Sequence, residues 1–235
     1  MTSVNPADDG TAPGGPAEEP SGGELRIVAA AQLSATQLGR IQAIYAQAFP
    51  PHLRVPLADL AVPGSRDQFL TALDGDDPVG FAALRLLAAP RWAFLRYYGV
   101  AADRRRRGYG ARFWHQLGPM LVPLGWPTRI AFEVEDPADA HDDAAERAIR
   151  RGRIAFWERC GAAVLPVPGY VMPALTSIGH PEPMILMGSD PEACWPLPGP
   201  ELAALVRAIF TEHYGLPPDH RLVTGAIASI KDGSG

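Results

Sequence analysis

An arginine- and glycine-rich turn, set between an apolar strand and a helix, constrains the fold of this chain more than any other segment. The strand-like stretch Trp92 to Val100 leads into Arg105-Arg106-Arg107-Gly108-Tyr109-Gly110, and a helical pattern runs from Gly108 to about Val122. The first turn of a helix leaves backbone N–H groups unpaired, and its dipole favours an anion there. Glycine lets a phosphate approach the main chain, and arginine adds charge-assisted hydrogen bonds. The segment therefore predicts a cradle for a pyrophosphate group.

The apolar periodicity along the chain predicts a mixed sheet with helices on its faces, an α/β (α+β) fold. The expected strands are Leu25–Ala30, Phe69–Leu73, Val79–Leu87, Trp92–Val100, Arg129–Glu135, Ala162–Val167 and Met184–Met187. The expected helices are Ser34–Ala48, Gly108 to about Val122, Asp142 or Asp143 to Cys160, and Pro200–His213. Short turns should pair the early strands antiparallel. The strand–helix–strand unit from Trp92 to Glu135 should supply one parallel pair.

Composition divides the 235 residues into three parts. Residues 1–23 are rich in Pro, Gly, Ala and acidic side chains and hold almost no large apolar ones, so we expect a disordered leader. Residues 24–190 should form one folded domain, and residues 191–235 a C-terminal helix followed by a poorly patterned tail. That helix is apolar along Leu202, Leu205, Val206 and Ile209, so it should pack either on the core or on a second subunit of a homodimer.

Charge and cysteine content exclude several classes of protein. The net charge of −5 argues against a general nucleic-acid binder. No apolar run approaches the roughly 20 residues needed to cross a bilayer, and the start of the chain lacks a basic stretch followed by an apolar one. We therefore expect no membrane partner and a cytoplasmic location. Cys160 and Cys194 have no CxxC spacing, and the histidines show no ligand spacing, so no metal site is expected.

The turn resembles motif A of the GNAT superfamily, the acetyl-coenzyme A-dependent N-acyltransferases. The family pattern is Arg or Gln, two residues, Gly, one residue, then Gly or Ala, matched here by Arg105, Gly108 and Gly110. An apolar strand-end residue five positions before the arginine is also part of the pattern, and Val100 occupies that place. The resemblance extends over about residues 25–188. It implies a mostly antiparallel sheet with one splayed parallel pair, and acetyl-CoA as the cosubstrate.

The resemblance also implies roles for the residues of the turn. The backbone of Val100 and Ala102 would hold the pantetheine arm, with the Val100 N–H near the thioester carbonyl, and Arg105 would orient the loop. The pyrophosphate would be held by the backbone amides of Arg106, Arg107, Gly108, Tyr109, Gly110 and Ala111. Two other interpretations of the arginine run stay open, a nucleic-acid or localisation patch and a solvated charged turn.

Two carboxylates follow in the strand Arg129–Glu135. Period-two alternation places Glu133 and Glu135 on one face, opposite Ile130 and Phe132. In the resembled fold this strand diverges from the motif A strand, so a carboxylate there could accept a proton from an acceptor ammonium or bind it. We expect their mutual repulsion to raise one pKa, which suits a base. Glu133 is the preferred candidate because it lies deeper in the strand, and a solvent-facing strand side is the alternative.

The residue that would protonate the leaving thiolate is atypical. The family often ends its next helix with Tyr, three residues, then Gly-Phe, and here Trp157 stands in the Tyr position before Gly161 and Ala162. An indole N–H donates a hydrogen bond but is no general acid near neutral pH. Tyr170, in the loop between the last two core strands, is the alternative candidate for this proton donor. The other interpretation of Tyr170 is an ordinary half-buried loop aromatic.

The resemblance implies direct acyl transfer from acetyl-CoA to a primary amine of a small molecule, with no covalent enzyme intermediate. We therefore predict an N-acetyltransferase. Trp157, together with the lack of a carboxylate on the motif A strand, motivates an alternative: a non-catalytic acyl-CoA-binding or regulatory module. The identity of the acceptor amine is left open by the sequence.

Overall fold

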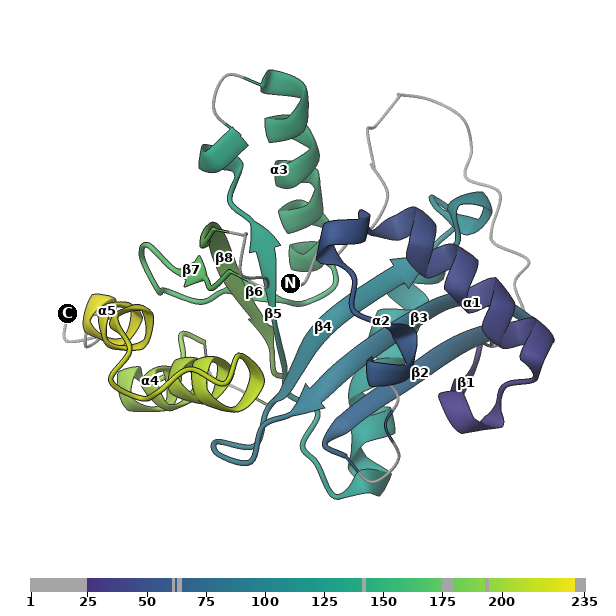
Figure 1. The fold of residues 1–235 in the computed structure, drawn as a ribbon, viewed down its shortest axis with the longest axis horizontal. Helices are drawn as coiled ribbons and strands as arrows, with labels where there is room; N and C mark the ends of the chain where they lie inside the picture. The colour runs from purple at the N-terminus through teal and green to yellow at the C-terminus, as the bar shows by residue number, and fades with distance from the viewer. Residues whose placement is uncertain are drawn as a thin grey trace.

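The strand that leads into the arginine run lies in the middle of one large sheet (Figure 1). The computed structural model describes residues 25–60, 62, 65–140, 143–174, 180–192 and 195–230. The predicted leader, residues 1–23, and Cys194 lie outside the described residues. The strands are β1 (Arg26–Ala29), β2 (Asp67–Asp74), β3 (Asp77–Leu86), β4 (Ala93–Val100), β5 (Ile130–Glu135), β6 (Ala163–Val164), β7 (Val171–Met172) and β8 (Glu182–Ser189).

The strand order is β1-β2-β3-β4-β5-β8-β6, with β7 pairing with β8 beside β6. The pair β4–β5 is parallel, and the other recorded pairs are antiparallel. The predicted mixed, mostly antiparallel sheet with one parallel pair is therefore confirmed. A right-handed strand–helix–strand crossover explains the parallel pair, because the helix after β4 returns the chain to the same end of the sheet.

Helices cover both faces of this sheet, as predicted (Figure 1). They are α1 (Ala35–Ala48), α2 (Tyr109–Leu121), α3 (Ala144–Arg159), α4 (Gly199–Ala208) and α5 (Arg221–Ser229). The apolar cluster beneath α2 and α3 includes Tyr98, Phe132 and Trp157. On the opposite face, α1 packs over Phe81 and Tyr97, while α4 and α5 share a cluster with β4, β5 and β8. Within the described chain, no helix has the length and apolarity to cross a bilayer.

Local sequence signals set the ends of α1. Ser34 caps the helix: its hydroxyl accepts from the Gln37 N–H, and the Gln37 side chain accepts from the Ser34 N–H. The apolar positions Ile41, Ile44 and Tyr45 are buried against the sheet. After Phe49, two prolines begin a new short turn, because proline cannot continue the helical hydrogen bonding.

Two expected elements differ from the structure in the C-terminal third. The strand predicted over Ala162–Val167 is only two residues long, because Pro166 and Pro168 remove N–H donors from the ladder. The predicted tail contains the helix α5, which the sequence did not indicate. Its Thr224 and Gly225 are poor helix formers, and the cap is the His220 ring nitrogen, which accepts from the Leu222 N–H. Burial of Val223 and Ala226 stabilises it instead.

The C-terminal segment packs on the core of its own chain. In α4, Leu202, Leu205 and Val206 are fully buried in the cluster that also holds Phe94 and Ala131 of the sheet. The helix then widens into a π-helical turn, Ile209–His213, which ends at Tyr214. The apolar side of α4 therefore packs on the core, which is one of the two surfaces expected for it.

Candidate active site

The parallel strands β4 and β5 pair over only three residues. Ala93, Phe94 and Leu95 lie opposite Ile130, Ala131 and Phe132, and beyond that point the pairing ends. At the same point β4 contains a bulge, since Ala83 of β3 faces Tyr97 and Leu84 faces Leu95, which leaves Arg96 as the extra residue. The bulge turns β4 away from β5 and opens a gap between the two strands.

The end of β4 presents a backbone donor to this gap. The Ala101 N–H donates to the Val79 carbonyl of β3 at 2.8 Å. Because successive N–H groups of a strand point to opposite edges, the Val100 N–H faces the side of β5. The Val100 carbonyl accepts from Nε of Arg105 at 3.1 Å, so Arg105 fixes the turn that follows the strand.

The arginine turn has the backbone conformation of an anion cradle. Arg106 and Gly108 have φ angles of 57° and 77°, both left-handed, and α2 begins immediately afterwards at Tyr109. The Tyr98 hydroxyl donates to the Gly110 carbonyl at 2.5 Å and holds this first turn against the sheet. A side chain at Gly108 would meet no protein atom within 4 Å, so the space beside it is open. The first-turn N–H groups of α2, which lack helical partners, therefore lie beside open space that a ligand can enter.

The arginines of the run have different tasks. Arg104 pairs with Asp77 at 2.8 Å and lies over the ring of Tyr109, whose hydroxyl donates to Asp74 at 2.5 Å. These contacts attach the turn to the β2–β3 hairpin. Arg106 and Arg107 are exposed, as are Ala102 and Gly108 beside them. Arg104 and Arg105 therefore hold the turn in place, whereas Arg106 and Arg107 present two exposed positive charges.

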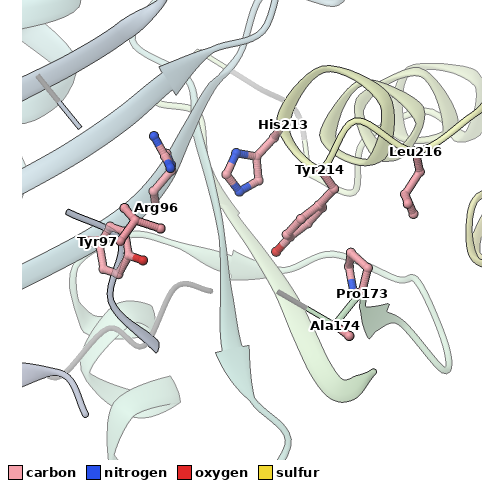
Figure 2. Close-up of a pocket in the computed structure, with 8 residues that line it drawn as sticks. Arg96, Tyr97, Pro173, Ala174, His213, Tyr214 and Leu216 are labelled. Carbon is pink, nitrogen blue, oxygen red and sulfur yellow. The ribbon is translucent and has the colours of Figure 1, made fainter. Parts of the chain in front are cut away.

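A pocket of about 210 Å³ lies on the opposite face of the sheet, where β4 leaves β5 (Figure 2). Its walls come from four parts of the chain: the segment after α1, the β4 bulge, the chain just after β7, and the end of the π-helical turn. The lining residues are Val55, Arg96, Tyr97, Pro173, Ala174, His213, Tyr214 and Leu216. The Tyr97 hydroxyl donates to the Leu53 carbonyl at 2.8 Å and so fixes one wall.

Glu133 lies fully buried beside this pocket, between two tyrosines. The Tyr170 hydroxyl donates to Oε1 at 2.6 Å, and the Tyr214 hydroxyl donates to Oε2 at 2.5 Å. Burial raises the pKa of Glu133 above its ordinary value, and the two phenol hydrogen bonds oppose that rise. Burial also raises the pKa of both tyrosines well above 10, with the Glu133 charge as a further cause, so both remain proton donors. Tyr214 also lines the pocket.

The second predicted carboxylate is separate from this group. Glu135 forms an ion pair with Arg153 of α3 at 2.7 Å, and both side chains are mostly buried. The structure therefore brings Glu133 together with Tyr170 and not with Glu135. The raised pKa of Glu133 follows mainly from burial, in place of the mutual carboxylate repulsion expected from strand alternation.

His213 stands next to Tyr214 on the pocket wall. Its ring lies 4.7 Å from the Phe94 ring and 4.4 Å from the Tyr214 ring, centroid to centroid. Both ring nitrogens are buried and have no hydrogen-bond partner in the part of the chain that the structure describes. Burial, with the positive charges of Arg96 and Arg85, lowers the pKa of His213 well below its ordinary value. The imidazole is therefore neutral, with one donor and one acceptor that have no partner among the described residues.

Trp157 and Cys160 belong to the core. Trp157 is fully buried among Tyr98, Trp114 and Phe132, so it neither replaces a general acid nor lines the pocket. Burial raises the pKa of Cys160 to about 11, which keeps the thiol protonated and unreactive. Among the described residues, no three His, Cys, Asp or Glu side chains gather in a group that would hold a metal ion.

Tyr214 and His213 were not singled out by sequence reasoning. They close the predicted C-terminal helix, Pro200–His213, and no motif surrounds them. Tyr214 lies 81 positions from Glu133, so only the fold reveals their contact. The available signal was the polar pair itself, His-Tyr, at the end of an apolar helix.

Comparison with solved structures agrees with this fold. An acetyltransferase of the GNAT family from Bacteroides thetaiotaomicron superposes with a TM-score of 0.62 at 19% identity, covering 82% of this chain and 99% of that one. An aminoglycoside 6′-N-acetyltransferase from Enterococcus faecium gives a TM-score of 0.51 at 16% identity, covering 70% and 96%. A structure of aminoglycoside 6′-N-acetyltransferase complexed with coenzyme A gives the same values. At these identities the likeness concerns the fold. Curated proteins offered no match to the sequence.

The family model of the GNAT acetyltransferases matches residues 38–162, more than half of the chain. The matched segment runs from α1 through the arginine turn to the end of α3. The chain therefore belongs to the acetyltransferase (GNAT) family, and the protein is an acyltransferase.

Proposed function

We propose that this protein transfers an acetyl group from acetyl-CoA directly to a primary amine of a small molecule. The observation that carries the proposal is the Glu133–Tyr214 contact at the wall of a pocket where β4 and β5 diverge. A buried carboxylate with a raised pKa is a group that can hold a proton taken from an ammonium ion. Family membership supplies the reaction class, acyl transfer.

Residues of the arginine turn fit the coenzyme A side of the reaction. The open space at Gly108 admits a phosphate next to the first turn of α2, and Arg106 and Arg107 are exposed beside it. The amides from Arg106 to Ala111 would hold the pyrophosphate, and the backbone of Val100 and Ala102 would hold the pantetheine arm. The bound thioester supplies the acyl group. The Val100 N–H, which faces the gap between β4 and β5, would stabilise the charge that develops on the thioester oxygen.

Tyr214 links the acceptor to the buried base. Its hydroxyl oxygen accepts a hydrogen bond from the ammonium, while its proton is already donated to Oε2 of Glu133. One proton passes from nitrogen to the Tyr214 oxygen as the phenol proton passes to Glu133. The phenol is neutral before and after, and the charge moves from the ammonium to the carboxylate. The neutral amine then attacks the thioester carbonyl, the carbon–sulfur bond breaks, and the coenzyme A sulfur leaves as the thiol with the second proton of the attacking nitrogen. Tyr170 positions Glu133 through its other oxygen.

A two-part assay tests this function. Calorimetric titration with acetyl-CoA measures binding, and release of the coenzyme A thiol with a panel of primary amines measures transfer. We expect binding and turnover, and Glu133→Gln should lower turnover at least roughly tenfold, as the loss of a general base does. Binding without turnover across a broad panel would support the non-catalytic module, and absence of binding would contradict both.

Three broader expectations accompany the proposal. The folded acyltransferase domain is assigned to residues 24–190, and residues 191–235 to a C-terminal extension that lines the acceptor pocket with His213, Tyr214 and Leu216. The reaction is assigned to the cytoplasm. Limited proteolysis of the intact chain, followed by mass spectrometry of the resistant fragments, tests whether the chain has a boundary near residue 190.

A further inference from the structure

The acceptor pocket lies next to a cluster of charges with an excess of positive charge. Asp67 accepts two hydrogen bonds from Arg85, at 2.6 and 2.9 Å, and a longer one from Arg96 at 3.3 Å. Glu212 pairs with Arg66 at 2.5 Å and also accepts from the Ala88 N–H. Two carboxylates thus face three arginines.

Arg96 is the arginine of this cluster that reaches the pocket. Its side chain is 13% exposed, and its Nε is buried without a hydrogen-bond partner among the described residues. Because the bidentate contact with Arg85 satisfies Asp67, the charge of Arg96 is only partly compensated. An anionic group bound in the pocket would compensate the rest of the Arg96 charge.

His213 presents a second unsatisfied polar group to the same pocket. Both of its ring nitrogens are buried and unpartnered within the described residues, which is costly unless a ligand or water pairs with them. In the view of Figure 2, His213 lies between Arg96 and Tyr214, and the Tyr214 hydroxyl points toward β5, where it donates to Glu133. The pocket therefore has a donor-rich end, with Arg96 and His213, next to the hydroxyl that would receive the amine.

The remaining described walls carry no carboxylate. They are formed by Val55, Tyr97, Pro173, Ala174 and Leu216, and Glu133 is sealed behind the two tyrosines. A polycationic acceptor would meet Arg96 without a compensating negative charge on these walls. An acceptor with an anionic end would be attracted by Arg96 and could accept a hydrogen bond from the imidazole of His213.

We propose that the acceptor is a small amine that also bears a carboxylate, bound with its carboxylate at Arg96 and His213 and its amine at Tyr214. This inference rests on the proposed function and narrows its substrate class to amino acids and related amino carboxylates. A binding role for Arg96 and His213 explains why buried nitrogens of both side chains lack partners in the described chain.

The test compares acceptors that differ only in that group. A series of ω-amino carboxylates, with chains long enough for the amine to have similar basicity in the carboxylate and the carboxamide, is assayed against the matching carboxamides. A polyamine is the third class of acceptor. We expect kcat/KM to be at least roughly tenfold higher for the best carboxylate than for its carboxamide, as for loss of one charge-assisted hydrogen bond. Equal values, or a preference for the polyamine, would overturn the proposal.

A variant assigns the preference to the side chain. Arg96→Gln should raise KM for the carboxylate at least roughly tenfold and leave the carboxamide nearly unchanged, which a purely structural role would not do. Arg26→Gln, which removes an exposed arginine paired with Asp76, is the matched control and should preserve the preference. The comparison in the wild-type protein stands even where Arg96→Gln does not fold.

The proposed function and this inference fail in different ways. If no acceptor of any class releases the coenzyme A thiol, the transfer proposal fails. Calorimetric binding of the carboxylate and the carboxamide to the coenzyme A-saturated protein then tests the pocket alone, and equal affinities would overturn the carboxylate assignment. Turnover of amines without a carboxylate preference would leave acyl transfer intact and exclude only the narrower substrate class.

Discussion

The hydroxyl of Tyr214 donates a 2.5 Å hydrogen bond to Oε2 of Glu133, a carboxylate with no exposed surface. The contact joins β5, inside the segment that the family model matches, to a residue beyond that segment. Because Tyr214 lines the pocket and Glu133 does not, the phenol is the part of this pair that a molecule in the pocket can reach.

Tyr214→Phe and Tyr170→Phe should separate proton transfer from positioning. Each phenol hydrogen bond lowers the pKa of Glu133, so removing either one should raise that pKa and move the acid limb of the pH–rate profile to higher pH. Only Tyr214→Phe removes the hydroxyl that faces the pocket, so only this variant should lose at least roughly tenfold in the plateau kcat. Full pH–rate profiles of both variants make the comparison, and equal plateau losses would contradict the distinct roles.

Glu133→Gln should be more stable than the wild type at alkaline pH while losing activity. The folded-state pKa of Glu133 lies above its unfolded value, so the folded state binds the proton more tightly. That contribution to stability is present below the unfolded pKa and is lost as the pH rises through the folded one. Urea unfolding should show that the free energy of unfolding of the variant, relative to that of the wild type, is higher at pH 8 than at pH 5.

Glu135→Gln provides the matched control for that experiment. It breaks the mostly buried ion pair with Arg153 and should reduce stability by a few kcal/mol, as measured by the same unfolding experiment. A stability gain in this variant at pH 8 would show that the effect at Glu133 is not specific to its burial.

Gly108→Ala should weaken coenzyme A binding beyond its cost to folding. A left-handed φ of 77° costs an alanine about 1 kcal/mol, and the new methyl group would occupy the space that the cradle leaves open. Gly125→Ala imposes the same conformational cost at φ 76°, with open space around it, but lies after α2 and away from the cradle. Thermal melting should show similar losses for both, and calorimetry should show lower coenzyme A affinity for Gly108→Ala alone.

Cys160 should be inert in the native protein. Its thiol is buried and its pKa is raised to about 11, so the thiolate is scarce near neutral pH. In a Cys194→Ser background, mass spectrometry should detect iodoacetamide labelling of Cys160 in urea and almost none under native conditions. Cys160→Ala should retain acyl transfer, because direct transfer requires no enzyme thiol. Loss of activity without loss of folding would point to a covalent intermediate.

The sequence predicted most successfully those features that depend on neighbouring residues. The strand, the turn around Gly108 and the following helix are contiguous, so spacing and backbone preference were enough to anticipate this unit and the family. Alternation along β5 also separated the faces correctly for Ala131 and Phe132. It failed for the pairing of Glu133 with Glu135, because Glu135 at the strand end turns to Arg153 of α3.

Features that depend on long-range packing were not available from the sequence. Tyr170 could be named as a candidate, but its hydrogen bond to Glu133 depends on β8, which pairs with both β5 and β7. Tyr214 and His213 reach the pocket only because α4 buries its apolar side on the sheet and the π-helical turn redirects the chain. The helix α5 follows the same rule, since its residues form a helix through contact with α4 rather than through intrinsic preference.

The arginine turn and the pocket are built by separate stretches of sequence. The cradle belongs to the turn before α2, whereas His213, Tyr214 and Leu216 of the acceptor pocket come from the C-terminal segment. Under the proposed function, reshaping residues 213–216 should therefore change which amine is accepted, while α4 stays in the core and the donor thioester continues to bind as before. For protein engineering, this segment is an exchangeable selectivity element, provided that each replacement keeps a hydroxyl in reach of Glu133.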